Sequence, residues 1–270
     1  MRKSSFLSQM LKRFTEHEIS RAAASLTYYL VFALFPFLVV LCALISRSDI
    51  LAFLGTELSG LVPKQVLQLI TSYIEHIERQ SSARLILWGA ALMLWSFYRA
   101  VSAVCAAMNK AWGAKRNKGI LCSILHTGAL TVFMALSILL FIAVLTFNEK
   151  ASYLISYLFP RSAAFICVWS FLRYPILAFT LFFILCALFR YSSLKEFTLR
   201  QVMPGVIFSL VCWYFSSLLY AWYAANLADY SNIYGSLGAV IVLLLWLQLG
   251  SMALLLGAEL NAFLWQKKAK

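Results

Sequence analysis

The sequence predicts an all-α, polytopic membrane protein with six transmembrane helices and short amphipathic helices at the membrane surface. Hydrophobic residues make up 63% of the 270 residues, 12% are charged, and the mean hydropathy is +0.83. Soluble domains of this size carry far more charge. Apolar residues also form long continuous runs, and residues 235–258 contain neither a charge nor a proline. A helix over that run would be about 36 Å long, enough to cross a hydrocarbon core of about 30 Å.

The chain opens with a basic arm, residues 1–20, whose apolar residues recur at helical spacing. We expect an amphipathic helix on the anionic inner surface of the membrane, with a solvated tail as the alternative. The first span is predicted over residues 23–45. Pro36 lies in its middle and predicts a kink, because proline removes a backbone N–H. Thr27 and its polar neighbours are expected to bond across a helix interface rather than to line a cavity.

Residues 46–83 predict an amphipathic segment on the outer surface, because their apolar residues recur with helical period between polar ones. The second span, 84–108, contains Arg99, about 22 Å along the helix axis from Arg84. An arginine inside the apolar region is by default a functional-site hypothesis with a partner to be named. We expect Glu259 to lie at a similar depth and either to pair with Arg99 or to share a polar pocket with it. The alternative is that Arg99 reaches the headgroups by itself.

The second half of the chain continues the same pattern of spans and short connections. A basic loop is expected at 109–119 and an outer connection at 148–167. Arg173 lies near the start of the fourth span, and Pro175 and Pro204 predict kinks in the fourth and fifth. The four further spans are predicted at 120–147, 168–190, 201–225 and 235–262.

The distribution of lysine and arginine sets the orientation. The N-terminal arm, the loops 109–119 and 190–200 and the C-terminal tail carry most of the basic residues. We therefore expect both termini in the cytoplasm and the whole chain to form one integral membrane domain. The net charge of +13 follows from this bias and predicts no nucleic-acid partner.

The last span has a face of small residues suited to close helix packing. Gly250, Ala253, Gly257 and Asn261 share this face at spacings of three and four, and helix-packing roles are also assigned to Gly235 and Gly238. Gln248 and Glu259 lie on another side. An acid just inside the end of a span is costly unless it is paired or hydrated. The alternative is that Glu259 lies at the level of the headgroups.

Three stretches together carry a family resemblance. They read RAAASLTYYLVFALFPFL in the first span, MPGVIFSLVCWYFSSLLY in the fifth, and YSNIYGSLGAVIVLLLW followed by GAELNA in the last. The combination resembles the bacterial YihY/virulence factor BrkB family over nearly the whole chain. The resemblance implies a multi-pass protein of the bacterial inner membrane. Some members carry the label ribonuclease BN, and others are linked to envelope integrity or to lipid or glycolipid transport.

The residues themselves give no pattern typical of a nuclease. Phosphodiester hydrolysis with metal ions needs clustered carboxylates or histidines. The chain has three histidines, which lie in the arm, the outer segment and a span: His17, His76 and His126. The acids are scattered, and no nucleotide-binding or nucleophile motif occurs. We expect no enzyme activity, no cofactor and no metal.

Two functions remain open. The first is a transporter or translocation path for an anionic lipid or glycolipid, with membrane lipids as partners. In this hypothesis Arg99 attracts the headgroup, Glu259 holds Arg99 when the site is empty, and Arg173 and Gln248 also contact the substrate. The alternative is a non-transporting scaffold for the envelope. The sequence leaves the oligomeric state open.

Overall fold

The computed structural model describes residues 6–44, 64–80, 83–113, 120–158, 163–193, 197–226 and 236–268. Within these residues all regular secondary structure is helical, as the sequence predicts. The helices are α1 (Phe6–Glu16), α2 (Ile19–Leu44), α4 (Lys64–Gln80), α5 (Ala83–Ala111), α6 (Ile120–Leu158), α7 (Ala163–Ser192), α8 (Leu199–Asn226) and α10 (Ser236–Lys268).

Five helices are long and apolar enough to cross a membrane. Their apolar segments agree with the first, second, third, fifth and sixth predicted spans: Ile19–Leu41, Leu87–Ala111, Leu121–Leu140, Leu199–Tyr223 and Gly238–Gln266. The fourth predicted span falls in α7, where the apolar stretch found among the described residues is the shorter Ala178–Ser192. The count of six spans therefore stays a prediction.

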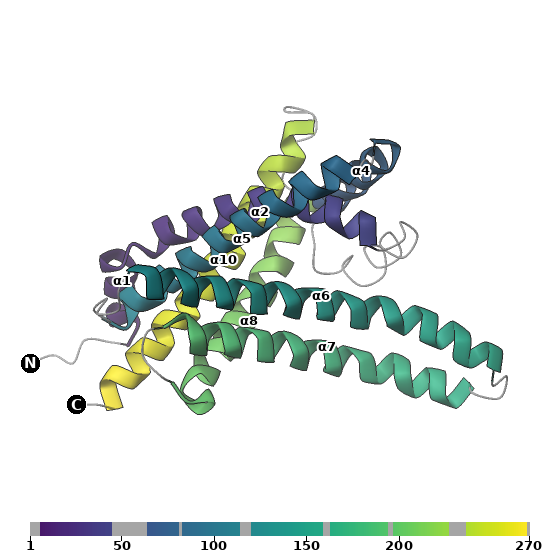
Figure 1. Ribbon diagram of the computed structural model, residues 1–270. Helices are drawn as coiled ribbons and strands as arrows, with labels where there is room; N and C mark the ends of the chain where they lie inside the picture. Colours follow the sequence, from purple (N-terminus) through teal and green to yellow (C-terminus); the bar gives the residue numbers. More distant parts are fainter. Residues whose placement is uncertain are drawn as a thin grey trace, which may run out of the picture.

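The helices form a bundle built on two close pairs. α2 packs along α5, α8 packs along α10, and α10 also contacts α2. α6 and α7 lie side by side as a long hairpin that extends beyond the other helices, while α1 lies near the C-terminal end of α10 (Figure 1). The main core lies where α2, α5, α6, α7, α8 and α10 meet, and its buried side chains include Val101, Met134, Phe189 and Val206.

Most of the predicted connection 148–167 is helical. Residues 148–167 were expected to link two spans, yet α6 continues to Leu158 and α7 begins at Ala163. The polar residues from Asn148 mark the end of the apolar run but not of the helix. Glutamate, lysine and alanine are good helix formers, and the first proline after this point is Pro160.

Several helix ends follow from local chemistry. At the start of α8, the side chain of Gln201 accepts a hydrogen bond from the backbone N–H of Thr198 at 2.9 Å, as in a capping box. α1 and α2 meet at Glu18, whose φ of 54° is left-handed. Helices α2, α7 and α8 run through Pro36, Pro175 and Pro204, and kinks there remain a prediction.

Candidate functional site

The backbones of α8 and α10 touch at Gly205 and Gly257. A Cβ added to Gly257 would overlap the Ser209 hydroxyl and the Gly205 carbonyl, and one added to Gly205 would overlap the Gly257 carbonyl. Asn261, 2% exposed, closes this crossing. Its Oδ1 accepts from the Gly205 N–H at 2.7 Å, and its Nδ2 donates to the Val202 carbonyl at 2.8 Å. The side chain thus bonds one backbone group on each side of Pro204.

The same face of α10 continues along α8 towards the start of α10. A Cβ on Gly250 would lie 3.2 Å from the Trp213 ring, so this glycine also sets a close approach. Gly238 is buried, and Gly235 lies outside the described residues.

Gln248 joins α10 to α2. The Thr27 hydroxyl lies 3.0 Å from Gln248 Oε1 and 3.0 Å from Ser251 Oγ. Gln248 Nε2 donates to the Ser20 carbonyl at 3.4 Å. Thr27 therefore bonds across a helix interface, as expected, and both ends of the Gln248 amide are engaged there.

Glu259 binds residues of the N-terminal arm. Its side chain is 3% exposed, and Arg13 Nε donates to its Oε2 at 2.9 Å. His17 Nδ1 lies 2.5 Å from Oε1. Arg13 also donates to Gln266 Oε1 at 2.8 Å and to the Ala111 carbonyl at 2.9 Å. Arg13, His17 and Glu259, called the arm clamp below, fasten α1 to the ends of α5 and α10.

The predicted pair of Arg99 and Glu259 is therefore wrong, because the two residues lie at different levels along α5. Arg13 contacts both Glu259 and Ala111, so Glu259 is level with the end of α5. At 1.5 Å per residue, Arg99 lies about 18 Å away along α5.

Arg99 instead contacts Tyr29 of α2. Its Nε and Nη2 donate to the Tyr29 hydroxyl at 3.2 and 2.7 Å, and its guanidinium carbon lies 5.0 Å from the ring centroid. Among the described residues its other N–H groups have no partner. Arg99 is exposed, lies at the centre of the span Leu87–Ala111, and shares its face of α5 with the exposed Trp88 and Trp95.

A groove lies on the same face of α5 as Arg99, nearer to the N-terminal end of that helix. It encloses about 520 Å³ between α2, α4 and α5. Its lining is apolar and aromatic and includes Phe32, Phe35, Pro36, Tyr73, Trp88 and Leu92. The groove, together with the neighbouring Arg99 and Tyr29, is called the outer path, because it lies on the face of α5 that points away from the centre of the bundle. Arg173 is the other basic residue that the sequence predicts within a span. Its side chain is not among those that the structure describes.

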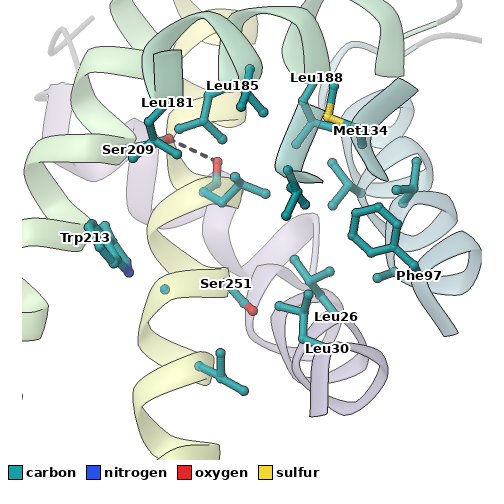
Figure 2. Close-up of a pocket in the computed structure, with 18 of the residues that line it drawn as sticks. Leu26, Leu30, Phe97, Met134, Leu181, Leu185, Leu188, Ser209, Trp213 and Ser251 are labelled. Carbon is teal, nitrogen blue, oxygen red and sulfur yellow. Dashed lines mark hydrogen bonds between the residues drawn. The ribbon is translucent and has the colours of Figure 1, made fainter. Parts of the chain in front are cut away.

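A separate, partly open cavity of about 380 Å³ lies between the helices of the bundle. Six helices line it, and Figure 2 shows Leu26, Leu30, Phe97, Met134, Leu185 and Leu188 among the side chains around it. On α5, Phe97, Val101 and Val104 line this inner cavity. At 100° per residue, Arg99 lies on the opposite side of α5 from them, so the inner cavity and the outer path are separate.

The two histidines whose side chains are described have separate partners. His17 belongs to the arm clamp, and His126 Nε2 lies 2.7 Å from the Tyr191 carbonyl. The side chain of His76 lies outside the described residues. In the part of the chain that is described, no three histidine, cysteine or acidic residues come together as metal ligands would.

Comparison with known proteins places these features in a family. The Virulence factor BrkB family matches residues 10–270. The chain belongs to this family. It is 29% identical over 269 residues to the ribonuclease-like protein YfkH of Bacillus subtilis (strain 168), covering 98% of this chain and 96% of that protein. No solved structure matches.

Other relatives of this BrkB-family chain are named as membrane proteins. It is 26% identical over 267 residues to the UPF0761 membrane protein NMB0524 of Neisseria meningitidis serogroup B, covering 96% of this chain and 64% of that longer protein. It is 21% identical over 280 residues to the UPF0761 membrane protein NT05HA_1801 of Aggregatibacter aphrophilus (strain NJ8700), covering 98% of this chain and 94% of that one. With its long apolar helices, the chain is a multi-pass membrane protein.

Proposed function

We propose that this BrkB-family protein provides a translocation path for an anionic lipid or glycolipid across the bacterial inner membrane. The observation that carries the proposal is Arg99, an exposed arginine at the centre of a span with a single phenol as its described partner. A charged side chain at mid-bilayer costs about 2.5–3.5 kcal/mol even on insertion scales. A passing phosphate or carboxylate would offset that cost.

The chemistry of Arg99 suits a lipid headgroup. A guanidinium forms two parallel hydrogen bonds to a phosphate or carboxylate, and Tyr29 uses Nε and one N–H of Nη2. Tyr29 would hold the guanidinium in place while its remaining N–H groups bind the anion.

The groove above Arg99 suits the hydrocarbon part of the same molecule. Its aromatic and aliphatic walls lie on the outer side of α2 and α5, where the chains of the surrounding lipids are in reach. A headgroup at Arg99 and a chain in the groove would occupy the outer path together. Arg173 is a second candidate contact for the headgroup. Gln248, bonded to α2, is assigned a packing role.

A lipid-flipping assay tests this proposal. Protein is reconstituted in liposomes containing fluorescent phosphatidylglycerol, and the rate at which label in the inner leaflet becomes accessible is measured. Losing a hydrogen bond to a charged group costs about 1.5–3 kcal/mol, so Arg99→Ala should slow flipping about tenfold or more. Arg84→Ala is the matched control, because Arg84 is exposed and shares that face at the start of α5.

Two results would contradict the proposal. One is wild-type protein that flips lipid no faster than protein-free liposomes, which would favour the scaffold function. The other is an Arg99→Ala rate equal to that of Arg84→Ala.

A further inference from the structure

We infer that the inner cavity is a second binding site, which holds one acyl chain of a membrane phospholipid. This site is separate from the outer path, since Arg99 lies on the opposite side of α5 from the residues lining the inner cavity. The inference therefore does not rest on the proposed function.

The lining of the inner cavity favours a hydrocarbon chain over a polar ligand. Leucine, isoleucine, valine, phenylalanine, methionine and tryptophan dominate it. The two serines of its lining are engaged in hydrogen bonds within the bundle. Ser209 Oγ donates to the Leu254 carbonyl at 3.3 Å, and Ser251 lies 3.0 Å from Thr27. The cavity therefore offers a chain dispersion contacts and gives a headgroup no charge to bind.

The position of the inner cavity identifies the source of that hydrocarbon. Val101, Leu210 and Gly250 line it, and each lies near the middle of an apolar span. At this depth the surrounding solvent is acyl chains. Apolar walls offer water no hydrogen-bond partners, and an unfilled volume deprives its lining of packing contacts. A lipid chain is the abundant molecule that satisfies both conditions.

The size of the inner cavity agrees with a single chain. Its volume of about 380 Å³ lies at the lower end of the range for small-molecule sites, roughly 300–1,000 Å³. The walls come from α2, α5, α6, α7, α8 and α10, so a bound chain would contact both close helix pairs and the α6–α7 hairpin. It would act as part of the packing between them.

Photocrosslinking tests the inference. The protein is reconstituted in phosphatidylethanolamine and phosphatidylglycerol vesicles that contain a phospholipid with a diazirine in the middle of its acyl chain. After illumination, adducts are mapped by mass spectrometry. We expect adducts on residues lining the inner cavity, such as Leu30, Met134 and Leu188. A parallel sample carries a diazirine fatty acid instead.

Leu185→Trp should lower these adducts several-fold, because the indole occupies the inner cavity. Phe183→Trp is the matched control, since Phe183 lies on the same helix but is 57% exposed. Val104→Phe fills the cavity from α5 and serves if Leu185→Trp does not fold. Arg99→Ala should leave the adducts unchanged, so a failure of the outer path would not be mistaken for a failure here.

Three results would overturn the inference. The first is labelling confined to outward-facing residues such as Leu136 and Leu140. The second is equal labelling of the inner cavity in the filled and control variants. The third is labelling of the inner cavity by the fatty acid alone, which would assign the site to a free fatty acid.

Discussion

Arg13 and Glu259 lie 246 positions apart in the sequence and form a hydrogen-bonded ion pair of 2.9 Å. The carboxylate is nearly inaccessible, and Arg13 also reaches the end of α5 through the Ala111 carbonyl. The described part of the basic arm, α1, is therefore attached to the bundle. Its position near α10 and α5 lets it hold the ends of two spans together.

Breaking the arm clamp should destabilise the protein. Removing one partner of a buried ion pair costs about 3–5 kcal/mol, and Arg13→Ala should fall at or below the lower end because His17 remains beside Glu259. Thermal unfolding in detergent, followed by tryptophan fluorescence, measures the effect. Lys12→Ala is the control, since the pair of Lys12 with Glu16 is 3.5 Å long and exposed, and such pairs contribute little. Equal melting of the two variants would exclude a stabilising role for the clamp.

Gly257→Ala should lower the melting temperature, because its new methyl group would overlap the Ser209 hydroxyl and the Gly205 carbonyl. Overpacking of this kind costs about 1–3 kcal/mol. Gly128→Ala in α6 is the matched control, since nothing lies within 4 Å of its added Cβ. That variant should melt like wild type or slightly higher, because alanine favours the helix. A Gly257→Ala variant as stable as Gly128→Ala would show that the two backbones do not touch.

Asn261→Leu should destabilise the α8–α10 crossing by a different route. The leucine leaves both the Gly205 N–H and the Val202 carbonyl without their side-chain partner, and an unmet buried polar group costs about 1–3 kcal/mol. Thr71→Ala, which removes an exposed bond to the Gln68 carbonyl within α4, is the control and should change little. Melting temperatures of the two variants provide the comparison. A loss no larger than that of the control would mean that the backbone groups find other partners.

The positions of the spans could be predicted from the sequence because a helix that crosses the hydrocarbon core must be apolar over about 20 residues. The predicted spans 84–108 and 201–225 lie within α5 and α8, which cover Ala83–Ala111 and Leu199–Asn226. Hydropathy could not predict how far α6 continues, since helix propensity and not lipid contact decides its end beyond Asn148.

The candidate site could be predicted only in part, because it depends on which helices meet. The small face of α10 follows from spacing, but its contact with Gly205 does not. The partner of Glu259 was missed because the arm was treated as a surface element. A signal was available, since Arg13 and His17 are four residues apart and would share one face of a helix. The inner cavity has no sequence signal, since six helices contribute to it.

The number of spans depends on whether α7 crosses the membrane, and the sidedness of the loops around α7 tests this. Six spans would put the connection 159–162 outside and the connection 194–196 inside, with both termini in the cytoplasm. In a variant lacking the native cysteines, Ser162→Cys should react with a membrane-impermeant maleimide in intact spheroplasts, whereas Lys195→Cys should react only after lysis. Asn117→Cys in the basic loop and Ser59→Cys between α2 and α4 serve as inside and outside references, because both positions precede α7 in the chain. If α7 did not cross, positions 162 and 195 would react from the same side. That topology would carry the basic C-terminal tail to the outer face, against the positive-inside rule.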